Sequence, residues 1–313
     1  METVLVTGAG GFLGQHLVNL LVEMGVPNIV AIGGRVRKPS AGRNPSSKVC
    51  HVYGDLNNTE FVKSIYLSKP DVIFHLAANP IVKMDEANPS QIIHDNVVVT
   101  NNLLAYAPKG CAFVNASSAT VYGCEAEFEA EEDWPLRPIS VYAATKVASE
   151  HLVNVYTSLS RVCGINLRMV ANVGPGATHG LVKDVIEKLR RPQSHLELLG
   201  KNPGSVKPFV HVKDTASAFY LVAKKRLWNS EQAINISSND SISVKQVACI
   251  VMEELGIAKP IAWLGDSANW KGDNPLVRVC PDLAVVNGWN PSCPSASKAV
   301  RQAVKDIVAS EQR

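Results

Sequence analysis

Tyr142 and Lys146 are a pair of residues whose types and spacing could do chemistry together. A separation of four positions places two side chains on the same face of a helix. A lysine ammonium beside a phenol favours the phenolate and lowers the tyrosine pKa, so the phenol can serve as a general acid or base near neutral pH. The same spacing also arises by chance in helices that use Tyr for packing and Lys for solubility, so its surroundings must decide.

A hydroxyl-rich stretch precedes this helix. Residues 113–123 read FVNASSATVYG, an apolar strand that runs into small hydroxyl residues. Ligands of open α/β sheets bind outside the carboxyl ends of the strands, so we expect Ser118 and Thr120 in a crevice where their hydroxyls can hydrogen-bond a substrate oxygen. The alternative is a serine-rich turn that satisfies its own backbone.

A glycine-rich turn lies near the start of the chain. Residues 7–14 read TGAGGFLG, after an apolar strand and before an apolar periodic segment. Gly8, Gly11 and Gly14 permit a tight turn, a close approach of backbone to phosphate, and close packing of helix on strand. The following helix presents free N–H groups and a positive dipole end to a diphosphate. This order predicts a dinucleotide site; a purely structural glycine turn is the alternative.

The residues after the second strand bear on which dinucleotide binds. An acid there holds the ribose of NAD, whereas an arginine accommodates the 2′-phosphate of NADP. The strand ends at Gly33 with no acid, and Arg35 and two further cations follow. This pattern favours NADP over NAD, although backbone groups can also hold the NAD ribose. Asp55, after the next strand, can accept a hydrogen bond from the adenine amino group or cap the following turn.

The composition excludes several classes of protein. The 313 residues are 46% apolar and 19% charged, with 31 basic and 28 acidic residues, a balance typical of a globular chain with a full core. No dense basic run indicates nucleic-acid binding, and no apolar run reaches the roughly 18 residues of a membrane helix. Seven scattered cysteines without a Cys-x-x-Cys pair indicate free thiols rather than zinc or disulfides. With no secretory signal, we expect a cytoplasmic protein without a metal site.

The elements that must position these residues alternate through the first half. Apolar runs predict buried strands at 4–6, 29–32, 71–76, 112–114 and 165–168, and periodic segments predict helices at 13–24, 61–67, 96–106 and 140–158. This alternation is typical of an α/β fold with a doubly wound parallel sheet. We expect 125–138 to be a surface excursion, and mixed helices and loops to form a smaller lobe packed on the carboxyl edge of the sheet.

At these residues the sequence resembles the extended short-chain dehydrogenase/reductase family, especially its nucleotide-sugar epimerases. The string SSATVYG at 117–123 looks most like that of UDP-galactose/UDP-glucose 4-epimerases. The matching pieces lie in family order along nearly the whole chain: TGAGGFLG (7–14), GDL (54–56), HLAA (75–78), Asn96 ahead of Thr100, SSATVYG, Tyr142 with Lys146, GPG (174–176), KPFVHVKD (207–214), KGD (271–273) and GWNP (288–291).

The resemblance implies a Rossmann domain over 1–168 plus about 205–240, and a substrate-binding lobe over 169–204 and 241–313. It implies Tyr142 as catalytic acid/base, Lys146 on the nicotinamide ribose and the tyrosine, and Ser118 on the reacting oxygen. It also suggests a homodimer built partly on the Tyr142 helix. The implied cofactor contacts are Gly8, Gly11, Phe12, Leu13, Gly14, Arg35, Asp55, Leu56, Leu76, Ala77, Ala78, Asn96, Tyr142 and Lys146. The implied substrate contacts are Ser118, Thr120, Tyr142, Asn172 and Lys207.

Departures from the family pattern refine the expectation. Ala119 and Thr120 stand where the family's dehydratases carry an Asp-Glu pair, which argues against dehydration. Lys207 replaces an arginine that contacts the substrate diphosphate, keeping the charge without the bidentate fork. A second such arginine falls at Trp270, beside Lys271. The family's substrate asparagine aligns with Ala171, so Asn172 is its nearest counterpart.

The hypothesis is therefore an NAD(P)-dependent nucleotide-sugar 4-epimerase acting on a nucleoside-diphosphate sugar. One alternative is a one-way NADPH-dependent reductase of a 4-keto-6-deoxy nucleotide sugar, which uses the same residues. The other is a dinucleotide-sensing or nucleic-acid-binding protein that has lost catalysis. The modest net charge and the intact Ser118, Tyr142 and Lys146 argue against this last class.

Overall fold

The computed structural model describes residues 1–34, 47–82, 88–123, 129–229, 232–265 and 275–311. Its centre is a seven-stranded parallel sheet in the order β3-β2-β1-β4-β5-β6-β11. The strands are β1 (Thr3–Thr7), β2 (Asn28–Gly33), β3 (Val49–Tyr53), β4 (Val72–His75), β5 (Cys111–Ser118), β6 (Val162–Met169) and β11 (Ala233–Ile236). The predicted doubly wound α/β class is confirmed.

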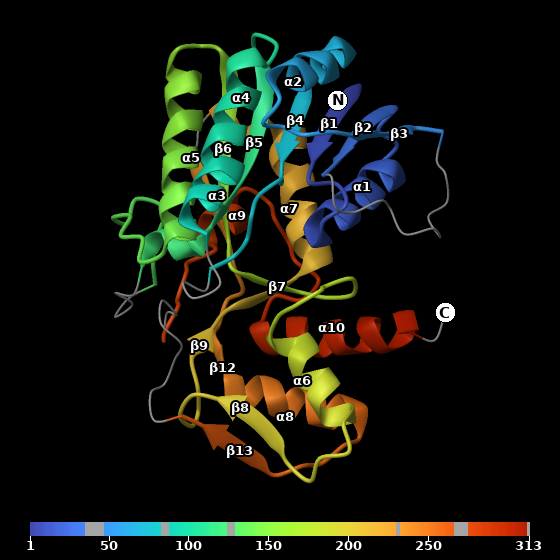
Figure 1. Ribbon diagram of the computed structural model, residues 1–313, viewed down its shortest axis with the longest axis vertical. Coiled ribbons are helices and arrows are strands. Elements are labelled where there is room, and N and C mark those ends of the chain that lie inside the picture. The colour runs from blue at the N-terminus through green and yellow to red at the C-terminus, as the bar shows by residue number, and fades with distance from the viewer. Residues whose placement is uncertain (35–46, 83–87, 124–128, 230–231, 266–274, 312–313) are drawn as a thin grey trace.

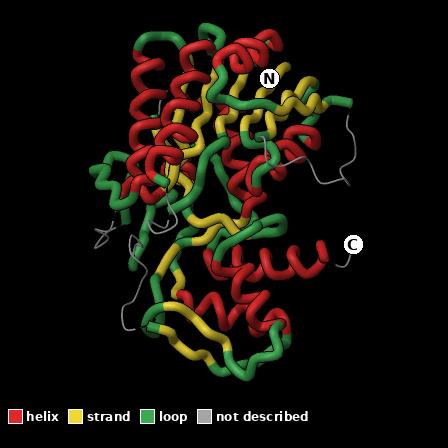
Figure 2. The backbone as a smooth tube through the Cα atoms, viewed as in Figure 1, coloured by secondary structure: helices red, strands yellow, loops and turns green. Residues whose placement is uncertain are grey.

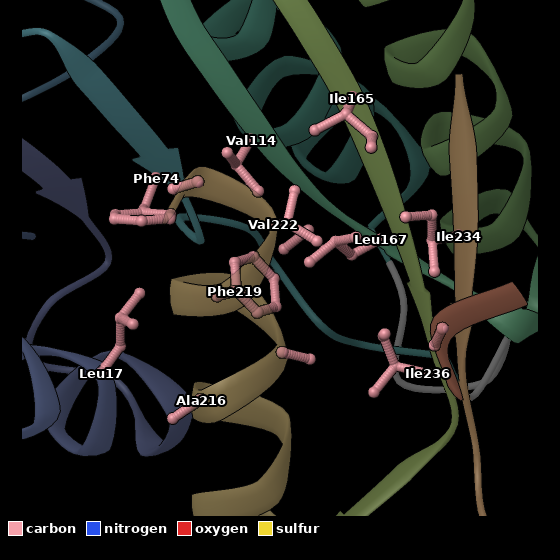
Figure 3. Close-up of a cluster of buried hydrophobic side chains, with 14 of the residues drawn as sticks. Leu17, Phe74, Val114, Ile165, Leu167, Ala216, Phe219, Val222, Ile234 and Ile236 are labelled. Atoms are coloured by element: carbon pink, nitrogen blue, oxygen red, sulfur yellow. The ribbon is translucent and has the colours of Figure 1, made fainter. Parts of the chain in front are cut away.

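Helices cover both faces of this sheet (Figure 1). One face carries α2 (Thr59–Ile65), α4 (Val99–Tyr106) and α5 (Val141–Ser158), and the other carries α1 (Phe12–Glu23), α7 (Val212–Lys225) and α9 (Asp282–Val286). The strands alternate between the two layers: Phe113 packs with the first set and Val114 with the second. Figure 3 shows the second layer, where Phe219 of α7 lies between α1 and the sheet. Burial on both faces explains why these strands read as continuous apolar runs.

The chain from 169 onward adds small sheets and helices below the carboxyl edge of the main sheet (Figure 2). These elements are β7 (Ala171–Val173), α6 (Leu181–Arg190), β8 (Leu196–Leu199), β9 (Val206–Lys207), β10 (Phe209–His211), β12 (Ile242–Ser243), α8 (Val244–Leu255), β13 (Ile261–Leu264) and α10 (Ala296–Glu311). A separate buried cluster joins α6, α8 and α10. Residues 281–289 pack instead with the main core, because Ala284 and Trp289 lie in its cluster.

Several boundaries differ from the sequence prediction. The helix expected from Asn96 starts at α3 (Pro89–Ile93), continues through a π-helical turn η2 (His94–Val98) and ends with α4. Asn88 caps it, and proline at the first helical position is a favoured start. Within 125–138, the described residues 129–138 are largely surface, but Ala130 is buried and pairs with Val279. Short 3-10 turns complete the chain: η1 (Tyr66–Ser68), η3 (Ala119–Tyr122) and η4 (Leu227–Asn229).

Candidate active site

The glycine turn between β1 and α1 is packed too closely for side chains. A Cβ on Gly14 would lie 2.2 Å from the Gly8 carbonyl oxygen, and a Cβ on Gly8 would lie 2.7 Å from the Ala77 nitrogen. Gly8 also has a φ of +68°, which glycine adopts without strain. No side chain caps α1 at Gly11, so its first N–H groups are open to an anion. This cradle fits the diphosphate of a dinucleotide, with Phe12 and Leu13 beginning the helix.

The end of β4 meets this turn. Thr7 Oγ1 accepts a hydrogen bond from Ala77 N at 3.2 Å, which fixes the backbone of Leu76, Ala77 and Ala78 beside Gly8. Asn96, buried in η2, holds the next residue, because its Oδ1 accepts from Asn79 N at 2.7 Å and its Nδ2 donates to Asn79 O at 3.2 Å. The sequence motif HLAA and Asn96 are therefore brought to the same edge of the sheet.

His75 is buried at the end of β4 between Thr7 and Thr100, at 2.9 and 3.0 Å. The Thr100 hydroxyl donates to Asn96 O at 2.6 Å, so its oxygen accepts from His75 Nε2. His75 Nδ1 then accepts from the Thr7 hydroxyl, and the neutral ring is fully bonded. Burial lowers the pKa of His75 to about 3, and the nearby Lys146 charge acts in the same direction.

Asp55 and Leu56 follow β3. Asp55 Oδ1 accepts from Asn57 N at 3.1 Å and from Asn57 Nδ2 at 3.3 Å, so the carboxylate caps a turn of its own. The next helix is capped by Asn58, and Leu56 is largely buried beneath it. Arg35, the other residue expected at the adenosine end of the dinucleotide, lies outside the described residues, as do Trp270 and Lys271.

Tyr142 stands in the first turn of α5, whose N-cap Ser140 accepts from Ala143 N at 3.1 Å. Burial raises the pKa of Tyr142 to about 12, and a hydrogen bond with Ser118 opposes that rise. The prediction that Lys146 lowers this pKa is wrong for this arrangement. Lys146 Nζ donates to Ala116 O at 2.8 Å and lies 5.7 Å from the centre of the tyrosine ring.

Lys146 is itself buried against β5. Burial lowers its pKa to about 8, while the carboxylate of Glu150, one turn further along α5, raises it. Glu150 pairs with Arg168 of β6 at 2.8 Å. The sequence analysis missed both residues. The spacing of 142, 146 and 150 was the available signal, because it marks one continuous helix face.

A cavity of about 260 Å³ opens beside Tyr142, between the carboxyl edge of the sheet and the lobe. Ser118, Thr120, Tyr142 and Lys207 all line it, so four of the predicted substrate residues lie together. Thr120 Oγ1 donates to Ser118 Oγ at 3.0 Å. The other lining residues are mostly apolar: Pro80, Val82, Ala119, Ile139, Ser140, Met169, Val170, Ala171, Pro208 and Val277.

Asn172 does not line this cavity among the described residues. It lies in β7, paired with Val210, and its Oδ1 accepts a hydrogen bond from the Thr215 hydroxyl of α7. Ala171 takes the place at the cavity wall. Because successive strand residues point to opposite faces, the shift of one position turns the asparagine side chain toward α7.

Three further observations concern a second cleft, metal-ligating side chains and membrane-spanning helices. A larger cleft of about 770 Å³ lies at the amino end of β4 and β5, lined in part by Met1 and Asp71, away from the glycine turn. No group of three metal-ligating side chains gathers in the described ranges. Within those same ranges, no helix is long and apolar enough to cross a membrane.

Comparison with known proteins agrees with this geometry. The sequence model of the NAD dependent epimerase/dehydratase family matches residues 4–237. A UDP-glucose 4-epimerase of Halalkalibacterium halodurans is 25% identical over 96% of this chain and 94% of its own.

Two solved structures share the fold over nearly their full length. The crystal structure of a UDP-galactose 4-epimerase has a TM-score of 0.83 and 31% identity over 99% of this chain and all of that one. The Thermus thermophilus UDP-glucose 4-epimerase, solved in complex with NAD, has a TM-score of 0.84 and 26% identity over 97% of this chain and 98% of its own. The chain belongs to the NAD dependent epimerase/dehydratase family.

Proposed function

We propose that this enzyme is an NAD(P)-dependent nucleotide-sugar 4-epimerase of the UDP-hexose type. The observation that carries the proposal is the cavity wall that Ser118 and Tyr142 share, near a glycine turn shaped for a dinucleotide. The relatives named UDP-glucose 4-epimerase match over almost the whole chain, including the lobe that closes this cavity.

In the proposed reaction, Tyr142 removes the proton of the sugar C4 hydroxyl and later returns it, while Ser118 holds the reacting oxygen by a hydrogen bond. Gly8, Gly11 and Gly14 would hold the dinucleotide, which would supply reversible hydride transfer at the sugar C4. Lys146, charged below a pKa of about 8, would bind the nicotinamide ribose through its ammonium group. Lys207 supplies positive charge for the substrate diphosphate.

The dehydratase and reductase alternatives are weaker. Ala119 and Thr120 offer no carboxylate pair for the loss of water. The one-way reductase of a 4-keto sugar is not favoured, because the relatives that match along the chain are named 4-epimerases.

The finer choice of cofactor depends on the end of β2. Gly33 stands where an acid would hold the NAD ribose, and the basic residues that follow favour NADP. The Thermus relative, in contrast, was solved with NAD.

We also expect a homodimer built partly on α5. On the outer face of this helix Val155 is 53% exposed, and Leu159, just beyond the helix, is 65% exposed. Light scattering on the purified protein checks the mass.

The proposed chemistry is tested by Tyr142→Phe, which keeps the ring and removes only the hydroxyl. We expect about a thousandfold loss of turnover of UDP-galactose, because proton transfer in the transition state contributes that order of rate. Dinucleotide affinity should change little. A turnover near that of the unmodified enzyme would overturn the catalytic assignment.

A further inference from the structure

The helix face that carries Tyr142 and Lys146 continues to a third polar residue. Glu150 is only 2% exposed and follows Lys146 by one helical turn. Its Oε1 accepts from the Ser117 hydroxyl and from Arg168 Nε at 3.0 Å, and its Oε2 accepts from Arg168 Nη2 at 2.8 Å. Every bond of the carboxylate therefore reaches the ends of β5 and β6, and β5 is the strand that presents Ser118.

The remaining nitrogen of Arg168 anchors this pair to the surrounding structure. Arg168 Nη1 donates to the Tyr122 hydroxyl at 2.9 Å and to Glu132 O at 2.7 Å, and Tyr122 donates in turn to Asn235 Oδ1 at 2.6 Å. The guanidinium also lies over the Tyr122 ring, 5.1 Å from its centre. The position of Glu150 is thus fixed by Ser117 and by Arg168, which is itself held by Tyr122 and Glu132.

Stability alone does not explain a pair of this kind. Buried ion pairs are often no more stabilising than apolar residues of the same volume, because the loss of hydration offsets the attraction between the charges. The charge of Glu150 matters more to its other neighbour. Lys146 donates to one carbonyl, Ala116 O, and Glu150 is the anion on its own helix face.

Among the described residues, the other titratable groups around Lys146 do not supply a negative charge. On α5, Tyr142 is a neutral phenol at neutral pH, since burial raises its pKa to about 12. On β4, His75 is neutral because burial lowers its pKa to about 3. On β6, Arg168 is a cation whose charge is engaged by Glu150.

We propose that Glu150 is a positioning residue for the reaction, whose carboxylate, held by Arg168 and Ser117, keeps Lys146 in its ammonium form at neutral pH. The proposal deepens the function proposed above and relies on the same site. Replacing Glu150 by Gln keeps the shape, removes the carboxylate one turn from Lys146 and leaves the Arg168 charge uncompensated. At the 5–6 Å spacing of such helix neighbours and an effective dielectric near 20, the pKa of Lys146 should fall by about two units.

The test is the pH dependence of kcat for the unmodified enzyme and for Glu150→Gln, with Glu60→Gln as the control. Glu60 pairs with Lys63 on the surface, so its replacement removes the same charge far from the site. In Glu150→Gln the alkaline limb should move down by about two pH units, with about a tenfold or greater loss at pH 8 and about threefold or less at pH 6. Glu150→Asp, which restores a carboxylate, should return the limb toward its original place. An equal loss at every pH would show a merely structural role and overturn the proposal.

A second measurement needs no substrate. Carbon-13 NMR of protein labelled at the lysine Cε, with Lys146→Met used for assignment, reports the titration of Lys146 directly. In the unmodified protein it should titrate near pH 8, and titration below about pH 6 would overturn the proposal even if Glu150→Gln does not fold. Absence of sugar-nucleotide turnover in the unmodified enzyme would count against the proposed function, whereas the difference in this titration between the unmodified protein and Glu150→Gln would still decide the role of Glu150.

Discussion

Replacing Gly14 by Ala should weaken dinucleotide binding at the glycine turn far more than it weakens the fold. Alanine normally stabilises a helix by about 1 kcal/mol relative to glycine. Here the new Cβ would lie 2.2 Å from the Gly8 carbonyl oxygen and 2.8 Å from Ala9 Cα, and both neighbours are backbone. Relief therefore requires α1 to move by about 1 Å from the turn, since carbon and oxygen in contact need more than 3 Å.

That movement has two measurable effects. Overpacking of this kind destabilises by about 1–3 kcal/mol, so the melting temperature should fall by several degrees. The α1 N–H groups and the Gly8 backbone no longer converge on one diphosphate, so dinucleotide affinity, measured by calorimetry, should fall about a hundredfold. Asn19→Ala, on the exposed face of the same helix, is the control and should leave both quantities in place. If Gly14→Ala binds dinucleotide as tightly as Asn19→Ala, the packing argument for the cradle is refuted.

Two further predictions concern charge. Because the pKa of His75 is about 3 in the fold and near 6.5 when unfolded, the unfolded chain binds more protons between these values, and stability should fall by on the order of 4 kcal/mol as pH drops from 6.5 toward 3. His75→Asn should flatten that slope in urea unfolding at pH 4.5, 5.5 and 6.5; equal slopes would contradict it. Lys207→Ala should raise the KM for UDP-galactose about tenfold with kcat within about threefold, because a charge-assisted bond to the diphosphate acts equally in ground and transition states. A loss confined to kcat would place Lys207 at the reacting sugar instead.

The parts of the fold that could be predicted are those with a strong local signal. The central strands are buried on both faces, so each reads as an apolar run, as at Val4–Val6 within β1. The glycine turn is legible because the close contact of Gly14 with Gly8 lies between neighbours in sequence. Tyr142 and Lys146 are legible because one helix face carries both. The π-helical turn and the helix start at Pro89 were missed, since the polar residues around them resemble a loop.

Other features depend on contacts between distant residues. The strands of the lobe are two to four residues long, too short for a periodic pattern to show. The pairing of Glu150 with Arg168 joins a helix to a strand, and neither residue marks the other in the sequence. The orientation of Asn172 toward Thr215 follows from the register of β7 with β10, which the local sequence does not specify. The raised pKa of Tyr142 likewise arises from burial, which depends on the tertiary structure.

The central claim is that the enzyme inverts C4 of a nucleotide sugar without net consumption of cofactor. Proton NMR of the purified protein with UDP-galactose, with NAD and NADP in separate tubes and no other reductant, tests it most directly. The account predicts that UDP-glucose appears up to equilibrium in at least one tube, while the redox state of the dinucleotide stays constant. Absence of conversion in both tubes, or stoichiometric oxidation of NADPH by a 4-keto nucleotide sugar in its place, would contradict it.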